Sequence, residues 1–434
     1  MAIRIAIWKS LDAIARKALL QRPAVFGDKA IRDDVIDLIA HVRSTGDAAI
    51  RELTRKFDKA EPAEFRVSRD EIDAAIGALD ATAIDAIDLA IANVRRFHEE
   101  QVPTDISIDT MPGVRCERVS HPIESVGLYV PAGTAPLPSA AIMLAVPAAI
   151  AGCPSCVLCT PPRKDGLADP AVLVAASRAG IRDIFKIGGA QAIAAMAYGT
   201  ETVPKVDKVF GPGNAWVTCA KSLVAADPDG AAIDMPAGPS EVLVIADAQA
   251  SAEFVAADLL SQAEHGIDSQ VVLVTPAESF AADVVAEVEQ QIESLSRAPI
   301  ARQSLQHARA IVVDDIASAI EVSNQYAPEH LILQCQDPRR YLSQVRNAGS
   351  VFVGAWTPES AGDYCTGTNH VLPTYAYARS YSGLGVEHFM RRMTIQELTV
   401  EGLASLSSAI ITLAGLEGLD AHAAAVSRRL GEAP

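Results

Sequence analysis

Apolar and polar positions in the first hundred residues follow the period of a helix. Apolar side chains recur at spacings of three and four over residues 30–57 and again over residues 69–103, with charged residues between them. This spacing places the apolar side chains on one face of a helix. Ser68 and Asp80 are of the types that cap helix starts by accepting hydrogen bonds from free amides. We therefore expect amphipathic helices here, with two starting at these caps.

The pattern changes near residue 114. Residues 114–130 are rich in strand-forming side chains, and short, mostly apolar runs then alternate with helical patterns. Such alternation predicts parallel sheets whose strands are connected by helices. Because eight runs exceed one comfortable sheet, we expect an α/β protein with two parallel-sheet domains, followed by a mostly helical segment over residues 394–430. The runs cover residues 156–159, 184–187, 206–210, 242–245, 271–274, 311–313, 331–333 and 350–353.

Length and charge narrow the class of protein. The 434 residues exceed one typical domain, and half of them are hydrophobic. With 54 acidic and 37 basic side chains, the formal charge of −17 argues against a broad nucleic-acid surface. The N-terminus lacks the features of a secretory signal, and no run of eighteen apolar residues suggests a membrane helix. We expect a cytoplasmic protein with small-molecule substrates and neither nucleic-acid nor membrane partners.

The seven cysteines do not suggest a disulfide framework. Their odd number in a long chain fits a reducing compartment better than a set of disulfides. Cys153, Cys156 and Cys159 have a spacing that zinc or an iron–sulfur cluster would also allow. Because Cys156 and Cys159 belong to an apolar run, we favour a buried strand over a metal site.

Two glycine-rich loops follow predicted strands. Gly188-Gly189 and Gly211-Pro212-Gly213 each lead into a predicted helix, where glycine lets the backbone approach a ligand and free helix amides favour an anion. Trp216 occupies the third glycine position of the usual dinucleotide-binding fingerprint. The sequence therefore supports ligand loops without supporting a standard Rossmann site, and a P-loop is absent.

Four short motifs combine imidazole with carboxylate or amide groups. Gln262 and His265 are three residues apart at the predicted end of a helix, before Gly266, and would share one face. Such a histidine more often interacts only with the helix terminus. The other motifs are the dipeptide Glu329-His330, Asp363 with His370 in one loop, and Glu417 with His422 near the C-terminus. Glu and His are suited to proton transfer near neutral pH, although an isolated dipeptide of this kind is more often a loop detail.

Taken together, these motifs resemble the histidinol dehydrogenase family. The resemblance covers nearly the whole chain, and chance agreement of so many ordered motifs is very improbable. The matching stretches are VGLYVP at 126–131, KIGGAQAI at 186–193, GPGN at 211–214, DMPAGPSEV at 234–242, LSQAEH at 260–265, APEHL at 327–331, GDY at 362–364, NHVLPT at 369–374, and the terminal Glu417 and His422.

The resemblance implies a zinc- and NAD-dependent enzyme. It would oxidise L-histidinol to L-histidine through bound L-histidinaldehyde, with one zinc per subunit and two NAD consumed per substrate. Glu329 and His330 match the catalytic acid–base pair. The implied zinc ligands are Gln262, His265, Asp363 and His422; the substrate contacts are Ser240, Gln262, His265, His330, Asp363, His370, Glu417 and His422; and the NAD contacts are Tyr129, Gln191 and Asn214.

The resemblance also implies a domain division and a homodimer with shared active sites. Residues 1–25 would form an N-terminal helical extension, and residues 26–128 with 239–384 a first incomplete Rossmann-like domain carrying the metal and acid–base residues. Residues 129–238 would form a second such domain contacting NAD, and residues 385–434 a helical tail reaching the partner subunit. Ala132 departs from the family, since many relatives have glycine there. A dehydrogenase of another amino alcohol and a non-catalytic zinc-binding descendant are the alternatives.

Overall fold

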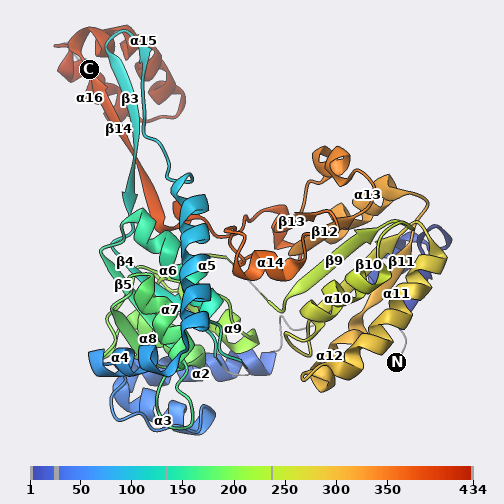
Figure 1. Ribbon diagram of the computed structural model, residues 1–434. Coiled ribbons are helices and arrows are strands. Elements are labelled where there is room, and N and C mark those ends of the chain that lie inside the picture. Colours follow the sequence, from blue (N-terminus) through green and yellow to red (C-terminus); the bar gives the residue numbers. More distant parts are fainter. Residues whose placement is uncertain (1–2, 24–28, 133–134, 236–237, 432–434) are drawn as a thin grey trace.

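The computed structural model describes residues 3–23, 29–132, 135–235 and 238–431. Two parallel sheets, each covered by helices, lie beside each other, and a thin arm projects from one of them (Figure 1). The two expected parallel-sheet domains are confirmed. Among the described residues, no helix is long and apolar enough to cross a membrane.

The larger sheet has six parallel strands in the order β1-β11-β10-β9-β12-β13. Every residue of β9, β10 and β12 is buried, as expected for strands with helices on both faces. The strands are β1 (Arg4–Ile7), β9 (Glu241–Ala246), β10 (Gln270–Thr275), β11 (Arg309–Val312), β12 (His330–Gln334) and β13 (Ser350–Val353).

Two apolar cores flank the six-stranded sheet. Val255 and Val284 belong to the core on one face, whereas Leu19 and Ile320 belong to the core on the other. Short 3-10 turns complete this domain. The helices are α1 (Ala13–Leu19), α10 (Ala252–Ala263), α11 (Glu278–Gln291), α12 (Ala298–Ser304), α13 (Ile316–Tyr326) and α14 (Glu359–Tyr364).

The smaller parallel sheet has five strands in the order β6-β5-β4-β7-β8. Its central strand, β4, is buried between two cores that contain Leu128 and Tyr129, respectively. The strands are β4 (Ser125–Tyr129), β5 (Ser155–Thr160), β6 (Asp183–Lys186), β7 (Lys208–Phe210) and β8 (Ala232–Ile233), and the helices that follow them are α6 (Pro138–Ala151), α7 (Pro170–Arg178), α8 (Gly189–Tyr198) and α9 (Ala215–Ala226).

The N-terminal helices pack on this smaller domain. Helices α2 (Lys29–Thr45) and α3 (Asp47–Phe57) are separated by Gly46, whose φ of 55° favours glycine. Helices α4 (Arg69–Ala78) and α5 (Ala81–Glu99) begin at the expected caps, since Ser68 and Asp80 accept amide hydrogen bonds. Val35 of α2 belongs to one core of the five-stranded sheet, and Ile91 of α5 belongs to the other.

This packing differs from the expected domain division. Residues 26–128 were grouped with residues 239–384, yet their helices cover the five-stranded sheet because the apolar faces of α2 and α5 meet α8 and α6 there. Residues 1–25 are not only helical either. Their β1 strand adds to the edge of the six-stranded sheet beside β11, so the start of the chain forms one domain with the segment from β9 to α14.

The arm consists of a three-stranded antiparallel sheet, ordered β14-β3-β2, and two helices at its end (Figure 1). The expected helical tail therefore starts with a long strand. This strand forms because nine consecutive residues pair with β3, which satisfies their backbone groups. The elements are β2 (Ile106–Met111), β3 (Val114–Pro122), β14 (Met390–Leu398), α15 (Val400–Leu416) and α16 (Asp420–Arg429).

Candidate active site

A cavity of about 330 Å³ is lined by residues of both parallel-sheet domains. Loops that follow strands of the smaller sheet contribute one wall, including Pro212 and Asn214. The six-stranded domain contributes the side chains that carry chemistry. They are Ser240, Gln262, His265, Glu329, His330, Asp363 and His370. Seven of the predicted site residues are thus brought together there, along with Asn214 from the cofactor group.

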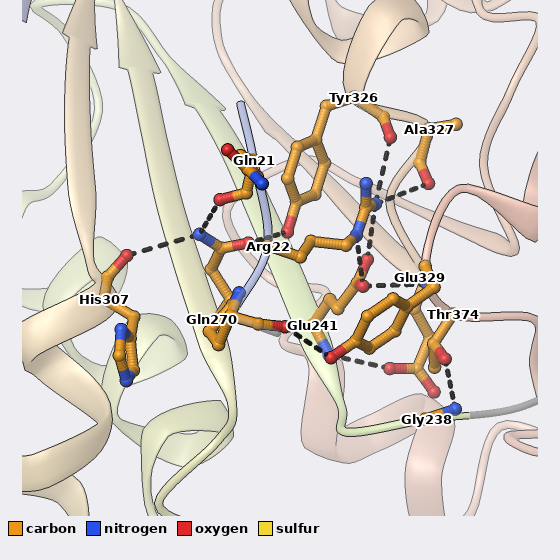
Figure 2. A network of polar contacts seen from close by, with 12 residues as sticks. Gln21, Arg22, Gly238, Glu241, Gln270, His307, Tyr326, Ala327, Glu329 and Thr374 are labelled. Carbon is orange, nitrogen blue, oxygen red and sulfur yellow. Dashed lines mark hydrogen bonds and ion pairs between the residues drawn. The ribbon is translucent and has the colours of Figure 1, made fainter. Parts of the chain in front are cut away.

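Glu329 lies at the entrance of β12 and is 6% exposed. Helix α13 ends at Tyr326, and Ala327 adopts a left-handed conformation with φ of 55°, which turns the chain into the strand. The carboxylate Oε2 of Glu329 accepts a hydrogen bond of 2.8 Å from the backbone N–H of Glu241 (Figure 2). Burial raises the pKa of Glu329 to about 8 because a charged carboxylate loses its hydration. The group is therefore suited to exchange a proton near neutral pH.

His330 is the first residue of β12 and is 4% exposed. Its Nδ1 lies 3.0 Å from the carbonyl oxygen of Glu241, and a carbonyl only accepts, so Nδ1 carries a proton. Its Nε2 is buried without a hydrogen-bond partner and lies 3.6 Å from Asp363 Oδ1. Burial lowers the pKa of His330, but the carboxylates around it outweigh burial and raise the pKa overall.

Adjacent side chains of a strand normally point to opposite faces, yet Glu329 and His330 line the same cavity. Glu329 precedes the strand, and its Oε2 lies 3.6 Å from Nδ1 of His330. The position of Glu329 just before the strand therefore lets both side chains face one cavity.

Gln262, His265 and Asp363 offer ligands of the kinds that hold zinc. Gln262, on α10, is fully buried, yet neither its amide oxygen nor its nitrogen has a hydrogen-bond partner. Unpaired buried amides are costly, so these atoms fit a site that a ligand completes. An amide oxygen, an imidazole nitrogen and a carboxylate form a mixed N/O set acceptable to a borderline metal.

Helix α10 ends earlier than expected. Its last residue is Ala263, and Glu264 caps it, so His265 lies just beyond the last turn and Gly266 is not the left-handed cap. His265 still packs back on the helix, because its Nδ1 donates to the carbonyl of Ser261 at 2.9 Å.

Three histidines of the cavity share one arrangement. His265, His330 and His370 each direct Nδ1 to a backbone carbonyl, at 2.9, 3.0 and 2.8 Å. The acceptor for His370 is the carbonyl of Asp363, and burial lowers the pKa of His370. In each ring Nε2 is left as the nitrogen available to a metal, a substrate or a proton, which is how ligating and catalytic imidazoles are usually oriented.

Glu359, next to His330, is a further acidic residue that the sequence motifs do not include. This residue is 1% exposed, both its carboxylate oxygens lack hydrogen-bond partners, and Oε1 lies 3.9 Å from Nδ1 of His330. Burial raises its pKa well above the ordinary value. In the described part of the chain, Glu359, His330 and Asp363 are the group close enough to share a metal ion. The spacing of Glu359 and Asp363 by four residues was the available signal, since it places both on one helix face.

Of the three predicted cofactor residues, Tyr129 and Gln191 are not among the residues that line this cavity. Tyr129, at the end of β4, is buried, and its hydroxyl accepts a hydrogen bond of 3.0 Å from the N–H of Gly189. Gln191, on α8, is buried with Nε2 unpaired. Asn214 caps α9 by accepting from two backbone amides, including that of Trp216. All three follow carboxyl ends of parallel strands, where α/β proteins bind ligands.

Within one chain, Glu417 and His422 do not reach the cavity. Both are exposed at the end of the arm, where α15 and α16 stand away from α10 and α14 (Figure 1). Cys156 and Cys159 lie on β5, so the strand expected there is confirmed. Ala132 is described, but its neighbours Gly133 and Thr134 lie outside the described residues, as do Pro236 and Ala237 of the matched motif.

Comparisons with known proteins agree over almost the whole chain. The family profile described as histidinol dehydrogenase matches residues 21–430. Histidinol dehydrogenase of Vibrio vulnificus is 54% identical over 428 residues, covering 99% of this chain and 98% of that protein. The enzyme of that name from Escherichia coli K12 is 52% identical over 423 residues, covering 98% and 96%. The crystal structure of histidinol dehydrogenase from Elizabethkingia anophelis superposes with a TM-score of 0.94 at 47% identity, covering 99% of this chain and 98% of that one.

Proposed function

This chain belongs to the histidinol dehydrogenase family, and on that premise we propose that it oxidises L-histidinol to L-histidine, the last step of histidine biosynthesis, with zinc and two molecules of NAD. The observation that carries the proposal is the meeting of the Glu329–His330 pair with Gln262, His265 and Asp363 in one cavity. The first two supply acid–base chemistry, and the other three supply metal ligands.

Zinc would be held by Gln262, His265, Asp363 and His422 of the partner subunit. The unpaired amide of Gln262 and the carbonyl-bound Nδ1 of His265 support this set, since both leave a ligand atom toward the cavity. When bound, zinc would hold the imidazole and amine of the substrate and so orient its hydroxyl. The substrate would also contact Ser240, His370 and Glu417.

NAD would approach from the five-stranded domain. Tyr129, Gln191 and Asn214 lie at the carboxyl edge of that sheet, and Asn214 also lines the cavity. When bound, NAD would supply the hydride acceptor for both oxidations. Asn214 and His330 line the same cavity, so a cofactor held by this domain would meet the substrate there.

In the first oxidation, His330 takes the proton of the substrate alcohol through Nε2. That nitrogen is free because Nδ1 is committed to the carbonyl of Glu241. The carboxylates around the ring stabilise the imidazolium that forms, since opposite charges in a buried site interact strongly. The aldehyde produced stays bound, which prevents loss of a reactive compound.

In the second oxidation, Glu329 activates water to attack the aldehyde. Its raised pKa favours this role, because a general base works best when its pKa lies near the working pH. The adduct of water and aldehyde then loses a hydroxyl proton, which His330 again accepts. Dividing the proton transfers between two groups allows both oxidations to occur in one cavity.

The arm supports a homodimer with shared sites. Glu417 and His422 are exposed there and do not line the cavity described above, and apolar side chains of both the arm sheet and the arm helices are exposed to solvent. Contiguous exposed apolar surface usually marks an interface. The exposed large apolar residues of the arm are Ile106, Ile108, Met111, Met393, Ile395, Leu398, Val400, Leu413, Leu416 and Leu419.

The substrate preference of the protein can be tested directly. Purified, zinc-loaded protein is assayed for NADH formation with L-histidinol and with amino alcohols that lack the imidazole. We expect a strong preference for histidinol, because the imidazole supplies one of the groups that the site holds. A greater kcat/KM for another amino alcohol would favour a different substrate, and absence of NADH with every alcohol would favour a non-catalytic protein.

A further inference from the structure

Glu241, the first residue of β9, contacts both members of the acid–base pair through its backbone. Its N–H donates to Oε2 of Glu329 at 2.8 Å, and its carbonyl accepts from Nδ1 of His330 at 3.0 Å. The strand ladder between β9 and β12 begins one residue later, where His330 pairs with Val242. The N–H and carbonyl of Glu241 therefore bond to the side chains of Glu329 and His330, and not to the backbone of β12.

The side chain of Glu241 is held from the opposite end of the sequence. Arg22 donates through Nε and Nη2 to the two carboxylate oxygens of Glu241 (Figure 2). The pair is well buried, with side-chain exposures of 11% for Arg22 and 2% for Glu241. Tyr375 adds a backbone N–H to the same carboxylate at 2.8 Å. The carboxylate is thus fixed by three donors.

Arg22 also holds the loop that delivers Glu329. Its Nη2 donates to the carbonyls of Tyr326 and Ala327, at 2.9 and 3.2 Å, and its guanidinium stacks 3.9 Å from the centre of the Tyr326 ring. These are the residues at the end of α13, directly before Pro328 and Glu329. One planar cation therefore links the strand that contacts the acid–base pair to the loop that carries it.

A buried ion pair is weak support for stability alone, because desolvation offsets much of the attraction between its charges. Arginine differs from lysine in presenting several donors in a fixed plane, and here that plane serves four acceptor atoms on two segments. Such an arrangement is better explained by a need for exact placement than by a need for charge.

We propose that Arg22 and Glu241 are positioning residues that set the geometry of Glu329 and His330 for proton transfer, an inference that rests on the proposed function. Neither residue touches the reacting atoms. Arg22 fixes the Glu241 side chain and the Tyr326–Ala327 carbonyls, and the Glu241 backbone then fixes the Glu329 carboxylate and the His330 tautomer. Misplacement of catalytic groups by about 1 Å can lower rates by about a hundredfold.

The test compares Arg22→Lys with Tyr326→Phe. Lysine keeps the charge but cannot donate to all four acceptor atoms, so kcat should fall by about 10- to 100-fold. The KM values for histidinol and for NAD should stay within about twofold, and the zinc content should be unchanged. Tyr326→Phe removes the buried hydrogen bond from the Tyr326 hydroxyl to Gln270 and keeps the ring over Arg22. It should lower thermal stability and leave kcat within about twofold. Wild-type kcat in Arg22→Lys, or equal kcat losses in both variants, would overturn the proposal.

A second variant and a crystal structure cover the remaining outcomes. If Arg22→Lys does not fold, the double variant Arg22→Met with Glu241→Met replaces it. This variant removes both charges and leaves no lone buried ion, so it should fold and show the same loss of kcat. A folded double variant with wild-type kcat would overturn the proposal. If the wild-type protein does not oxidise histidinol, the proposed function fails separately. Crystal structures of wild-type and Arg22→Lys proteins then decide: unchanged contacts of Glu329 and His330 with Glu241 in the variant refute the positioning role, and displaced ones support it.

Discussion

His330 directs its unpaired Nε2 toward Asp363, whose nearer carboxylate oxygen lies 3.6 Å away. The base of the proposed reaction and a proposed metal ligand therefore border the same small space. A substrate held by the metal would have its alcohol close to Nε2, so binding and proton transfer are coupled by geometry. The predictions below separate these two contributions.

The first prediction distinguishes two possible metal-ligand sets. Asp363→Asn should lose zinc and activity, because it removes a charged ligand of the proposed set. Glu359→Gln is the matched control on the same helix face, and it should retain zinc, since Glu359 is not in that set. Zinc is measured in dialysed protein by atomic spectroscopy. Zinc loss in Glu359→Gln with retention in Asp363→Asn would replace the proposed set by one centred on Glu359.

Chelation should also abolish activity reversibly. Of the proposed ligands within one chain, Gln262 lies on α10, His265 directly after that helix and Asp363 on α14. None of them lies on a strand, so removing the ion should not unfold either sheet. Added zinc should restore turnover without refolding, as followed by circular dichroism alongside the assay. Full activity of metal-free His265→Ala protein is the outcome that this account does not permit.

Glu329→Gln should separate the two oxidations. The amide cannot activate water, yet His330 keeps its Nδ1 contact with Glu241 and can still accept the alcohol proton. Oxidation of added aldehyde should fall by a factor of about 10² to 10⁴, and alcohol oxidation much less. Pre-steady-state NADH formation measures each step, and equal impairment of both would contradict the division of roles.

Aldehyde oxidation should depend on pH through Glu329. The base must be deprotonated to act, and burial raises the pKa of this carboxyl to about 8. The contribution of Glu329 to the rate should therefore rise with pH below about 8, by up to tenfold per pH unit, and level off above it. Stopped-flow rates between pH 6 and 10 check this. A flat profile across that range would show that Glu329 does not titrate as the base.

Subunit exchange tests the shared site. His265→Ala and His422→Ala proteins are each inactive, but a hybrid dimer has one site with both lesions and one with neither. Random pairing makes about half of the dimers hybrids, so roughly a quarter of wild-type activity should return on mixing. The control is a mixture of His265→Ala with Asp363→Asn protein, whose lesions lie in the same domain and should not complement. No recovery despite demonstrated exchange would contradict a site that takes His422 from the partner subunit.

The sequence predicts where strands form better than it predicts which strands pair with each other. All eight apolar runs are strands of the two parallel sheets, because strands buried on both faces must be apolar almost throughout. It does not predict that β1 adds to β11, some three hundred positions later, since the short run at Ile5 carries no signal of its partner. Strand β14 was expected to be partly helix because its pairing with β3, not its own composition, determines its state.

The candidate site was predictable wherever residues form local motifs. Glu329-His330, and Gln262 with His265, are visible in the chain, and their meeting follows from the edges of a parallel sheet. Arg22 was not detectable, because it occurs in a segment with no motif and acts through a contact with Glu241, far along the sequence. Glu359 was missed because a glutamate at a helix start is usually read as a favourable charge in the first turn, and only burial distinguishes it.

The most direct test of the proposed reaction is the number of NADH molecules formed per substrate. A limiting amount of L-histidinol is incubated to completion with zinc-loaded protein and excess NAD, and NADH and histidine are both quantified. We predict about two NADH and one histidine for each histidinol consumed, with no free aldehyde trapped by semicarbazide. One NADH per substrate with aldehyde as the product, or no NADH at all, would contradict the two-step oxidation at this site.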